Sequence, residues 1–177
     1  MKTMADAFAI CATSLLLALS SGIATSSAQT SRTPEVDPSG FASSADVQAQ
    51  LRDMLAAMKS DQGFMWRPLV RDGATVAAIE IWKKPGRPAV HPTEAEYATV
   101  LEGSGTLVWG GALTDAKVSN AKLIEGSQIQ GGATRTLGRG DVILIPAGVP
   151  HWFGITGDRL ILLGIKLPAP DDHLGED

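Results

Sequence analysis

Two histidines and two nearby acidic residues in this sequence are suited to bind a metal ion. His91 is followed closely by Glu94 and Glu96, and His151 comes later in the chain. Imidazole nitrogens and carboxylate oxygens are ligands for Fe(II), Mn(II), Ni(II), Cu(II) and Zn(II). Two histidines and one carboxylate would leave coordination positions open for water, substrate or dioxygen. The residue types therefore predict a divalent transition-metal site, provided that the fold brings them together.

His151 directly follows a segment that is typical of a strand and a tight turn. Val142 to Ile145 is a short apolar, β-branched-rich run, which predicts a strand buried on both sides. Gly140-Asp141 predicts a turn before this strand. Pro146-Ala147-Gly148 ends the strand, because proline has no donor for the ladder and glycine permits positive φ. His151 would then open the next strand, with its imidazole fixed at the mouth of a β structure.

The segments around the two histidines resemble the two sequence motifs of the cupin superfamily. The second motif, Gly-x5-Pro-x-Gly-x2-His, is matched at all of its fixed positions, by Gly140, Pro146, Gly148 and His151. The first motif is His-x-His, three or four residues, Glu, six residues and Gly, and it is matched from its second histidine onward by His91, Glu96 and Gly103. The resemblance covers roughly residues 64 to 167.

The resemblance implies an all-β fold, a cupin-type jelly-roll β-barrel of two antiparallel sheets. In the family, the equivalent His and Glu of the first motif and the His of the second bind a metal inside the barrel. The implied metal ligands are His91, Glu96 and His151. Glu96 is preferred to Glu94 because its spacing to the motif glycine fits, and Glu94 would then be a supporting group or a surface charge.

The sequence departs from the family motifs at two positions. The first histidine of the pair is replaced by Ala89, and the asparagine that often closes the second motif is replaced by Ile155. The missing ligand at Ala89 either opens one more coordination position or lowers the affinity enough to lose the metal. With no thiolate among the candidate ligands, the metal identity stays open among Fe, Mn, Ni, Cu and Zn.

Glu80 is a candidate catalytic residue because it interrupts the apolar strand that we expect from Thr75 to Trp82. If its side chain faces the cavity, burial would raise its pKa and it could act as a general base. If it faces water, it is a cross-strand partner for an arginine or lysine. The alternation of residue types does not distinguish these two orientations. The remaining histidine, His173, lies in an acidic tail and is interpreted as solvated.

Four tryptophans are numerous for a chain of this size. They are Trp66, Trp82, Trp109 and Trp152. They are expected to pack in the core, or to line an apolar ligand cavity. Trp152 and Phe153 are consecutive in an expected strand, so one of them should point inward near His151.

The expected barrel comprises residues 63–168. The segment before it, 43–62, is predicted to contain a helix from about Ser44 to Lys59. Ser43 or Ser44 can cap it, and an apolar stripe is spaced to pack against the barrel or a dimer partner. The stripe comprises Val47, Leu51, Met54, Leu55 and Met58. A homodimer through this stripe is therefore one alternative.

The expected strands are short and separated by glycine-rich turns, which is typical of a sandwich or a barrel. Glu102 to Gly105 and Gly157-Asp158 are expected to be two of these turns. The predicted strands are 64–70, 75–82, 96–101, 106–109, 134–137, 142–145, 152–156 and 160–167, with one or two more around 122–124. The acidic segment 169–177 would be a loose tail.

The first 28 residues are interpreted as a secretory signal peptide. The apolar run from Phe8 to Leu19 is too short to span a bilayer, and small residues ending at Ala28 suit cleavage after that position. A membrane anchor is the alternative. Residues 29–42 would be a linker. The one cysteine, Cys11, would leave with the signal, so a cysteine nucleophile is excluded from the mature, secreted or periplasmic protein.

The charge pattern excludes two classes of partner. The chain has 177 residues and a net charge of −4, with acids and bases interspersed, and no basic stripe supports nucleic-acid binding. No basic amphipathic helix indicates membrane binding once the signal is removed. Two hypotheses follow. One is a metal-dependent oxygenase, decarboxylase, isomerase or lyase acting on a small molecule; the other is a non-catalytic cupin that binds a small ligand or has lost its metal.

Overall fold

The computed structural model of the protein describes residues 40–169. The predicted signal peptide, Cys11, most of the predicted linker, His173 and residues 170–177 of the tail lie outside this range. Among the residues that are described, no helix combines the length and the apolar character needed to cross a membrane.

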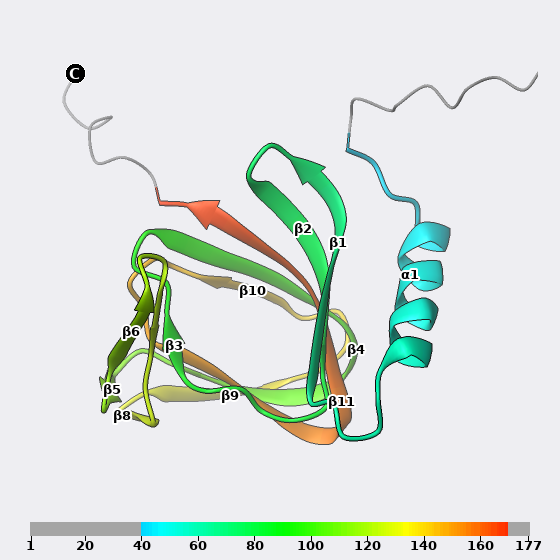
Figure 1. The fold of residues 1–177 in the computed structure, drawn as a ribbon. Helices are drawn as coiled ribbons and strands as arrows, with labels where there is room; N and C mark the ends of the chain where they lie inside the picture. The colour runs from blue at the N-terminus through cyan, green and yellow to red at the C-terminus, as the bar shows by residue number, and fades with distance from the viewer. Residues whose placement is uncertain (1–39, 170–177) are drawn as a thin grey trace, which may run out of the picture. The chain divides into compact units, whose positions relative to one another are not determined.

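The described chain consists of one helix followed by eleven strands (Figure 1). The helix α1 spans Ser44–Ala57, and the two long strands are β4 (Glu94–Trp109) and β11 (His151–Pro168). The remaining strands are β1 (Phe64–Asp72), β2 (Thr75–Trp82), β3 (Ala89–Val90), β5 (Ala112–Thr114), β6 (Lys117–Asn120), β7 (Leu123–Glu125), β8 (Gln128–Gln130), β9 (Ala133–Leu137) and β10 (Val142–Ile145). The strand expected around 122–124 is β7, and the short strands β3, β5, β6 and β8 were not predicted.

All strands pair antiparallel, in one nine-stranded sheet and one two-stranded sheet. In the larger sheet, β4 and β11 pair with each other from Trp109 and His151 at one end to Glu94 and Pro168 at the other. β4 also pairs with β9 and β10, and β11 also pairs with β2 and β3. The predicted all-β cupin-type jelly roll is therefore the observed fold.

Both long strands were predicted as pairs of shorter strands joined by turns, and this was wrong. Gly103 has φ of 84°, and a Cβ at this position would collide with the backbone carbonyl oxygen of Arg159. The register of β11 against β4 shifts between Ile155 and Leu160, beside this glycine. Glycine marks a bulge or a close approach inside a strand as readily as it marks a turn. The glycine-containing segments that were expected to be turns therefore lie inside the continuous strands β4 and β11.

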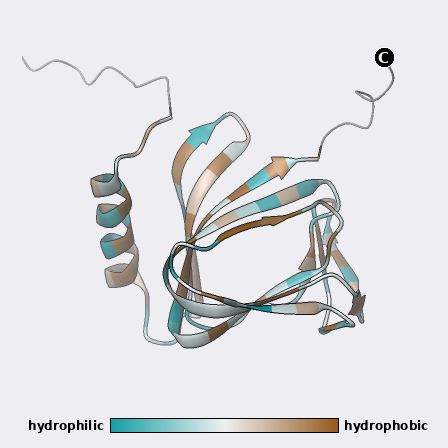
Figure 2. Cartoon of the chain, turned by 180° about the vertical axis from the view of Figure 1, so that it is seen from behind, coloured by the Kyte–Doolittle hydropathy of each residue, from teal (hydrophilic) through white to brown (hydrophobic). Residues whose placement is uncertain are grey.

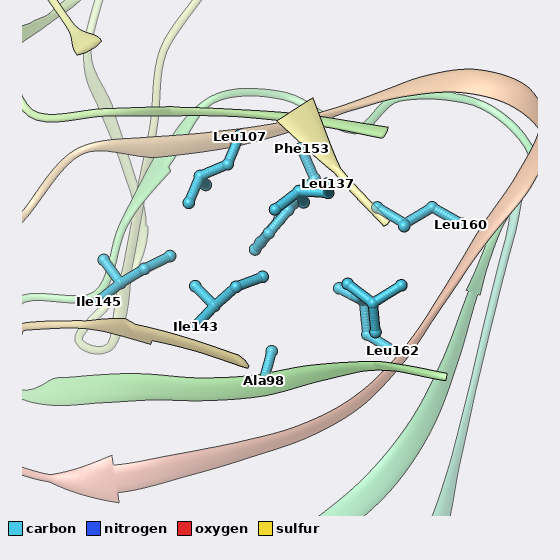
Figure 3. Close-up of a cluster of buried hydrophobic side chains, with 9 residues drawn as sticks. Ala98, Leu107, Leu137, Ile143, Ile145, Phe153, Leu160 and Leu162 are labelled. Carbon is cyan, nitrogen blue, oxygen red and sulfur yellow. The ribbon is translucent and has the colours of Figure 1, made fainter. Parts of the chain in front are cut away.

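The main core lies between the sheet faces and draws its side chains from four strands. Figure 3 shows apolar side chains of β4, β9, β10 and β11 converging on one another. The buried residues of this cluster are Ala98, Val100, Leu107, Leu137, Ile143, Ile145, Phe153, Leu160 and Leu162. This rigid core anchors the strand ends that carry the candidate metal ligands.

A second cluster fixes α1 against the sheet. The helix starts with a capping box, in which Ser43 accepts a hydrogen bond from the Asp46 backbone and Asp46 accepts one from the Ser43 backbone. Leu51 and Met54 are buried against Ile79, Ile81 and Ile161 of the sheet. The predicted apolar stripe therefore packs on the sheet of its own chain. The helix ends at Ala57, slightly before the predicted Lys59.

Strand β10 is buried on one face only, which corrects the prediction of burial on both sides. Ile143 and Ile145 are 6% and 3% exposed, whereas Val142 and Leu144 are both 64% exposed. The strand is hydrophobic along its whole length (Figure 2), so residue type alone gives no alternation. Within the described structure β10 pairs only with β4, and the side chains on its outer face are largely exposed.

Candidate metal centre

His151 is held by the turn that ends β10 and by the start of β11. The Val149 amide donates to the Pro146 carbonyl, which closes the turn, and the His151 Nδ1 lies 3.0 Å from the Val149 carbonyl oxygen. The Gly148 amide donates to the His91 carbonyl over 2.9 Å. This last bond ties the two sequence motifs together, so the turn holds the backbone at both histidines.

His91 lies between β3 and β4 and is oriented by the turn between β6 and β7. Its Nδ1 lies 3.0 Å from the backbone carbonyl oxygen of Lys122. A carbonyl oxygen can only accept, so Nδ1 of His91 and, by the same reasoning, Nδ1 of His151 carry the proton. The Nε2 atom of each neutral ring is then left as an electron-pair donor.

Glu96 brings its carboxylate between the two Nε2 atoms. Its Oε2 lies 3.5 Å from His91 Nε2 and 3.0 Å from His151 Nε2. One potential ligand atom from each of the three residues lies within 4.8 Å of the others. Three electron-pair donors that converge in a largely buried place need a cation or a proton between them. The residues present therefore fit a divalent metal ion bound by two imidazoles and one carboxylate.

Glu94 is separated from this cluster. Its carboxylate accepts a hydrogen bond of 2.7 Å from Lys122 Nζ. Successive residues of a strand point to opposite sides, so Glu94 and Glu96 share one face of β4. Glu96 is only 4% exposed, whereas the Glu94 side chain, on the first residue of the strand, is 15% exposed. The spacing to Gly103 thus selected the carboxylate that lies beside the histidines.

Lys166 is a member of the site that the sequence analysis missed. It pairs with Glu96 across β11 and β4, and its Nζ donates to Glu96 Oε2, the oxygen that also faces both histidines. The available signal was a single charged residue in the apolar run from Leu160 to Leu167. Its importance depends on the strand register, which the sequence does not contain.

Glu80 lines the same cavity as the candidate ligands, the first of its two predicted orientations. Burial is the main cause that raises its pKa to about 7, and the nearby charge of Glu96 adds to the effect. Trp82 Nε1 donates a hydrogen bond of 3.1 Å to Glu80 Oε2 and fixes the orientation of the carboxyl group. Near neutral pH this group is present in both its acid and its base form.

The two carboxyl groups of the cavity have opposite electrostatic environments. Burial alone would raise the pKa of Glu96, but the hydrogen bond that His151 donates in its doubly protonated form and the charge of Lys166 outweigh burial and lower the pKa to about 2. Burial is also the main cause that lowers the pKa of His91, with the Lys166 charge contributing. Glu96 is therefore an anion and His91 a neutral ring near neutral pH, as ligands for a metal must be.

The cavity has a volume of about 340 Å³ and is walled partly by aromatic side chains. The Phe64 and Trp82 rings lie 4.1 Å apart at one side. Both members of the consecutive aromatic pair line the cavity: Phe153 lies 6.0 Å from the His151 ring, and Trp152 donates to the Gly86 carbonyl. Ala89 also lines this cavity, whereas Ile155 packs against the main core.

A family model described as Cupin matches residues 86–173, which include both motifs and all three candidate ligands. The chain belongs to the cupin superfamily. The family match begins shortly before Ala89 and therefore includes the strand in which the first motif histidine is absent. No curated protein matches the sequence at a significant level.

Solved structures with a similar fold are distant in sequence. TT1209 from Thermus thermophilus is 17% identical, with a TM-score of 0.46, and the match covers 66% of this chain and 94% of that one. KdgF from Halomonas sp. is 17% identical, with a TM-score of 0.44 and coverage of 66% and 91%. An oxalate oxidase is 18% identical, with a TM-score of 0.43 and coverage of 62% and 53%.

Proposed function

We propose that this cupin is a metal-dependent enzyme that acts on a small molecule inside its cavity. The observation that carries the proposal is the convergence of His91 Nε2, Glu96 Oε2 and His151 Nε2, with one ligand atom of each residue within 4.8 Å of the others. Both Nδ1 atoms face backbone carbonyls, so both rings present an unprotonated nitrogen to the same place.

The three residues would hold a divalent transition metal, one of Fe, Mn, Ni, Cu or Zn. Such a metal, when bound, supplies a Lewis acid or a redox centre with positions open for water, dioxygen or an oxygen-bearing substrate. The protein fixes the geometry, because two of the ligands lie at the ends of strands that the core holds in place.

Glu80 is the proposed proton-transfer group. It faces the cavity, its pKa is raised to about 7, and the Trp82 indole holds one of its oxygens. A carboxyl group with this pKa can take a proton from a bound ligand and return it at neutral pH. This favours isomerase-type or lyase-type chemistry among the reactions of the superfamily, with oxygenase and decarboxylase types as the other members of the same proposal.

The substrate is proposed to be small and partly apolar. A cavity of about 340 Å³ is at the lower end of the sizes that protein ligand sites have. Phe64, Trp82 and Phe153 offer apolar contacts. His91, His151 and Lys166 gather around the carboxylate of Glu96. We further propose that the protein acts outside the cytoplasm, secreted or in the periplasm, after loss of residues 1–28.

A second candidate function is a non-catalytic cupin that binds a small ligand without metal. Two observations favour it. Ala89 supplies no ligand where the family motif has a histidine, and Lys166 already places a positive charge on Glu96. In this case the ammonium group would satisfy the carboxylate, and the cavity would serve binding alone.

Elemental analysis distinguishes the two functions. The chain should be purified without a histidine tag or chelator, and the same should be done with His151→Ala and with the Glu94→Gln control. About one equivalent of a transition metal in the parent and the control, lost in His151→Ala, is expected. Cobalt(II) titration, followed by visible absorption, gives an independent readout of bound imidazole ligands. Failure of the parent to take up any of the five metals after reconstitution would leave the non-catalytic function.

A further inference from the structure

Lys166 and the candidate ligands share one oxygen atom. The Lys166 ammonium group donates to Glu96 Oε2, the same atom that lies 3.0 Å from His151 Nε2 and 3.5 Å from His91 Nε2. The Glu96 side chain is 5% exposed, whereas the Lys166 side chain is 35% exposed. The carboxylate is therefore fixed inside the protein, and the lysine reaches it from the more open side of the cavity.

A buried carboxylate is costly unless a positive charge compensates it. Both imidazoles have Nδ1 bonded to a carbonyl, so as neutral rings they offer Glu96 no proton from Nε2. Lys166 is the one permanent cation that forms an ion pair with this carboxylate among the described residues. It therefore supplies the compensating charge in the protein without metal.

A divalent metal at the same three ligands would stand close to this ammonium group. Like charges at short range in a partly buried site repel by several times the thermal energy. The metal and Lys166 also require the same Glu96 oxygen. Binding of the metal and retention of the lysine contact are therefore opposed.

We propose that Lys166 is a tethered cation that competes with the divalent metal for Glu96 and thereby sets the affinity of the site. The proposal rests on the proposed metal-binding function. The cavity also contains Glu80, which gives the displaced ammonium group a second carboxyl partner. In this arrangement Lys166 is a positioning residue that holds the Glu96 carboxylate in place when no metal is bound.

The test is the affinity of the metal-stripped protein for Mn²⁺ and Co²⁺, measured by calorimetry in the parent and in Lys166→Met. Methionine keeps much of the side-chain length and apolar contact but removes the charge. The expected result is that the dissociation constant falls about tenfold or more. Lys166→Arg keeps the charge and is expected to bind like the parent. Without metal, Lys166→Met should have a lower melting temperature than the parent. The increase in melting temperature on addition of metal should be larger in Lys166→Met than in the parent.

Arg159→Met is the matched control. Arg159 also lies on β11, pairs with a carboxylate of β4, Glu102, and is 35% exposed like Lys166. This pair does not line the cavity, so the variant should leave metal affinity unchanged. Lys166→Gln serves as a second neutral variant if methionine at this position prevents folding.

The outcomes separate this inference from the proposed function. Metal binding in Lys166→Met but not in the parent would support the competition between Lys166 and the metal, and it would overturn the proposed metal-dependent function of the parent. Unchanged or weaker binding in both neutral variants, with normal binding in the parent, would overturn the inference alone. No binding in the parent or in any variant would overturn both.

Discussion

Ala89 and His151 are direct cross-strand partners, paired in the antiparallel register of β3 and β11. Ala89 also lines the cavity that contains the three candidate ligands. Residue 89, where the family motif has its first histidine, thus lies beside the site. The backbone there has the position that a ligand would need, but alanine supplies no ligand atom. A side chain with a donor nitrogen at position 89 would point into the same cavity.

Ala89→His is therefore expected to raise the metal affinity of the site, by on the order of tenfold or more for Co²⁺. The reason is that it adds a fourth protein ligand beside His151. Calorimetric titration of the metal-stripped variant measures the change. Val90→His is the control, because adjacent strand residues point to opposite faces. Equal effects of both substitutions would show that residue 89 does not face the metal.

Replacing Glu96 by glutamine should abolish or strongly weaken metal binding, because it removes the anionic ligand between the two imidazoles. Glu94→Gln should have no such effect, since the Glu94 carboxylate pairs with Lys122 instead. Metal content after dialysis against a weak chelator measures both variants. The opposite pattern would mean that Glu94, and not Glu96, is the metal ligand.

The sequence was sufficient to predict the three members of this cluster that lie in the motifs. It was insufficient to predict Lys166, which lies outside the motifs. His91, Glu96 and His151 lie at motif positions, and a motif records a recurring local geometry. Lys166 reaches the site because its strand pairs in one particular register with β4. Strand register depends on contacts between segments far apart in the chain, so local sequence patterns do not specify it.

The same limit explains the errors in the fold. Short apolar runs and glycine-rich segments were recognised, and the all-β jelly roll followed from them. Whether Gly103 turns the chain or bends a continuous strand depends on its approach to Arg159 in β11. Whether Val142 is buried depends on what lies on the outer face of β10. Both questions are decided by tertiary neighbours.

Glu80 should make the stability of the metal-free protein fall as the pH rises. Its pKa is about 7 in the folded protein and close to the ordinary value of 4.5 when unfolded. The folded state therefore binds more protons between about pH 4.5 and pH 7, and the free energy of unfolding decreases over this range. Above the folded pKa the ionised, buried carboxylate costs about 3 kcal/mol, by the conversion of a pKa difference into free energy.

Glu80→Gln removes this titration. From pH 5 to pH 8 the free energy of unfolding should therefore decrease less in the variant than in the parent. Urea denaturation of chelator-treated protein at several pH values measures it. Asp72→Asn, in an exposed position at the end of β1, is the control for a general effect of removing an acid. A pH-independent difference would show that Glu80 titrates normally in the folded state.

Val142→Asp should leave the protein folded, with a loss of no more than about 1 kcal/mol, because this side chain is 64% exposed and an aspartate there stays hydrated. Ile143→Asp should unfold the protein or cost more than about 4 kcal/mol, since it buries an unpaired charge in the main core. Thermal denaturation of both variants measures the contrast. Similar destabilisation by both would mean that the outer face of β10 is covered in solution.

Gly103→Ala should destabilise the protein far more than Gly73→Ala, although both glycines have positive φ, 84° and 53° respectively. At Gly73, in the turn between β1 and β2, a Cβ meets no atom within 4 Å, so the variant loses only the backbone term of about 1 kcal/mol. At Gly103 the Cβ would collide with the Arg159 carbonyl oxygen, so the paired strands β4 and β11 would have to move apart at this position. Chemical denaturation of both variants measures the difference. Equal losses would show that β11 moves away from β4 at this position without cost, and that the motif glycine is needed for its backbone conformation alone.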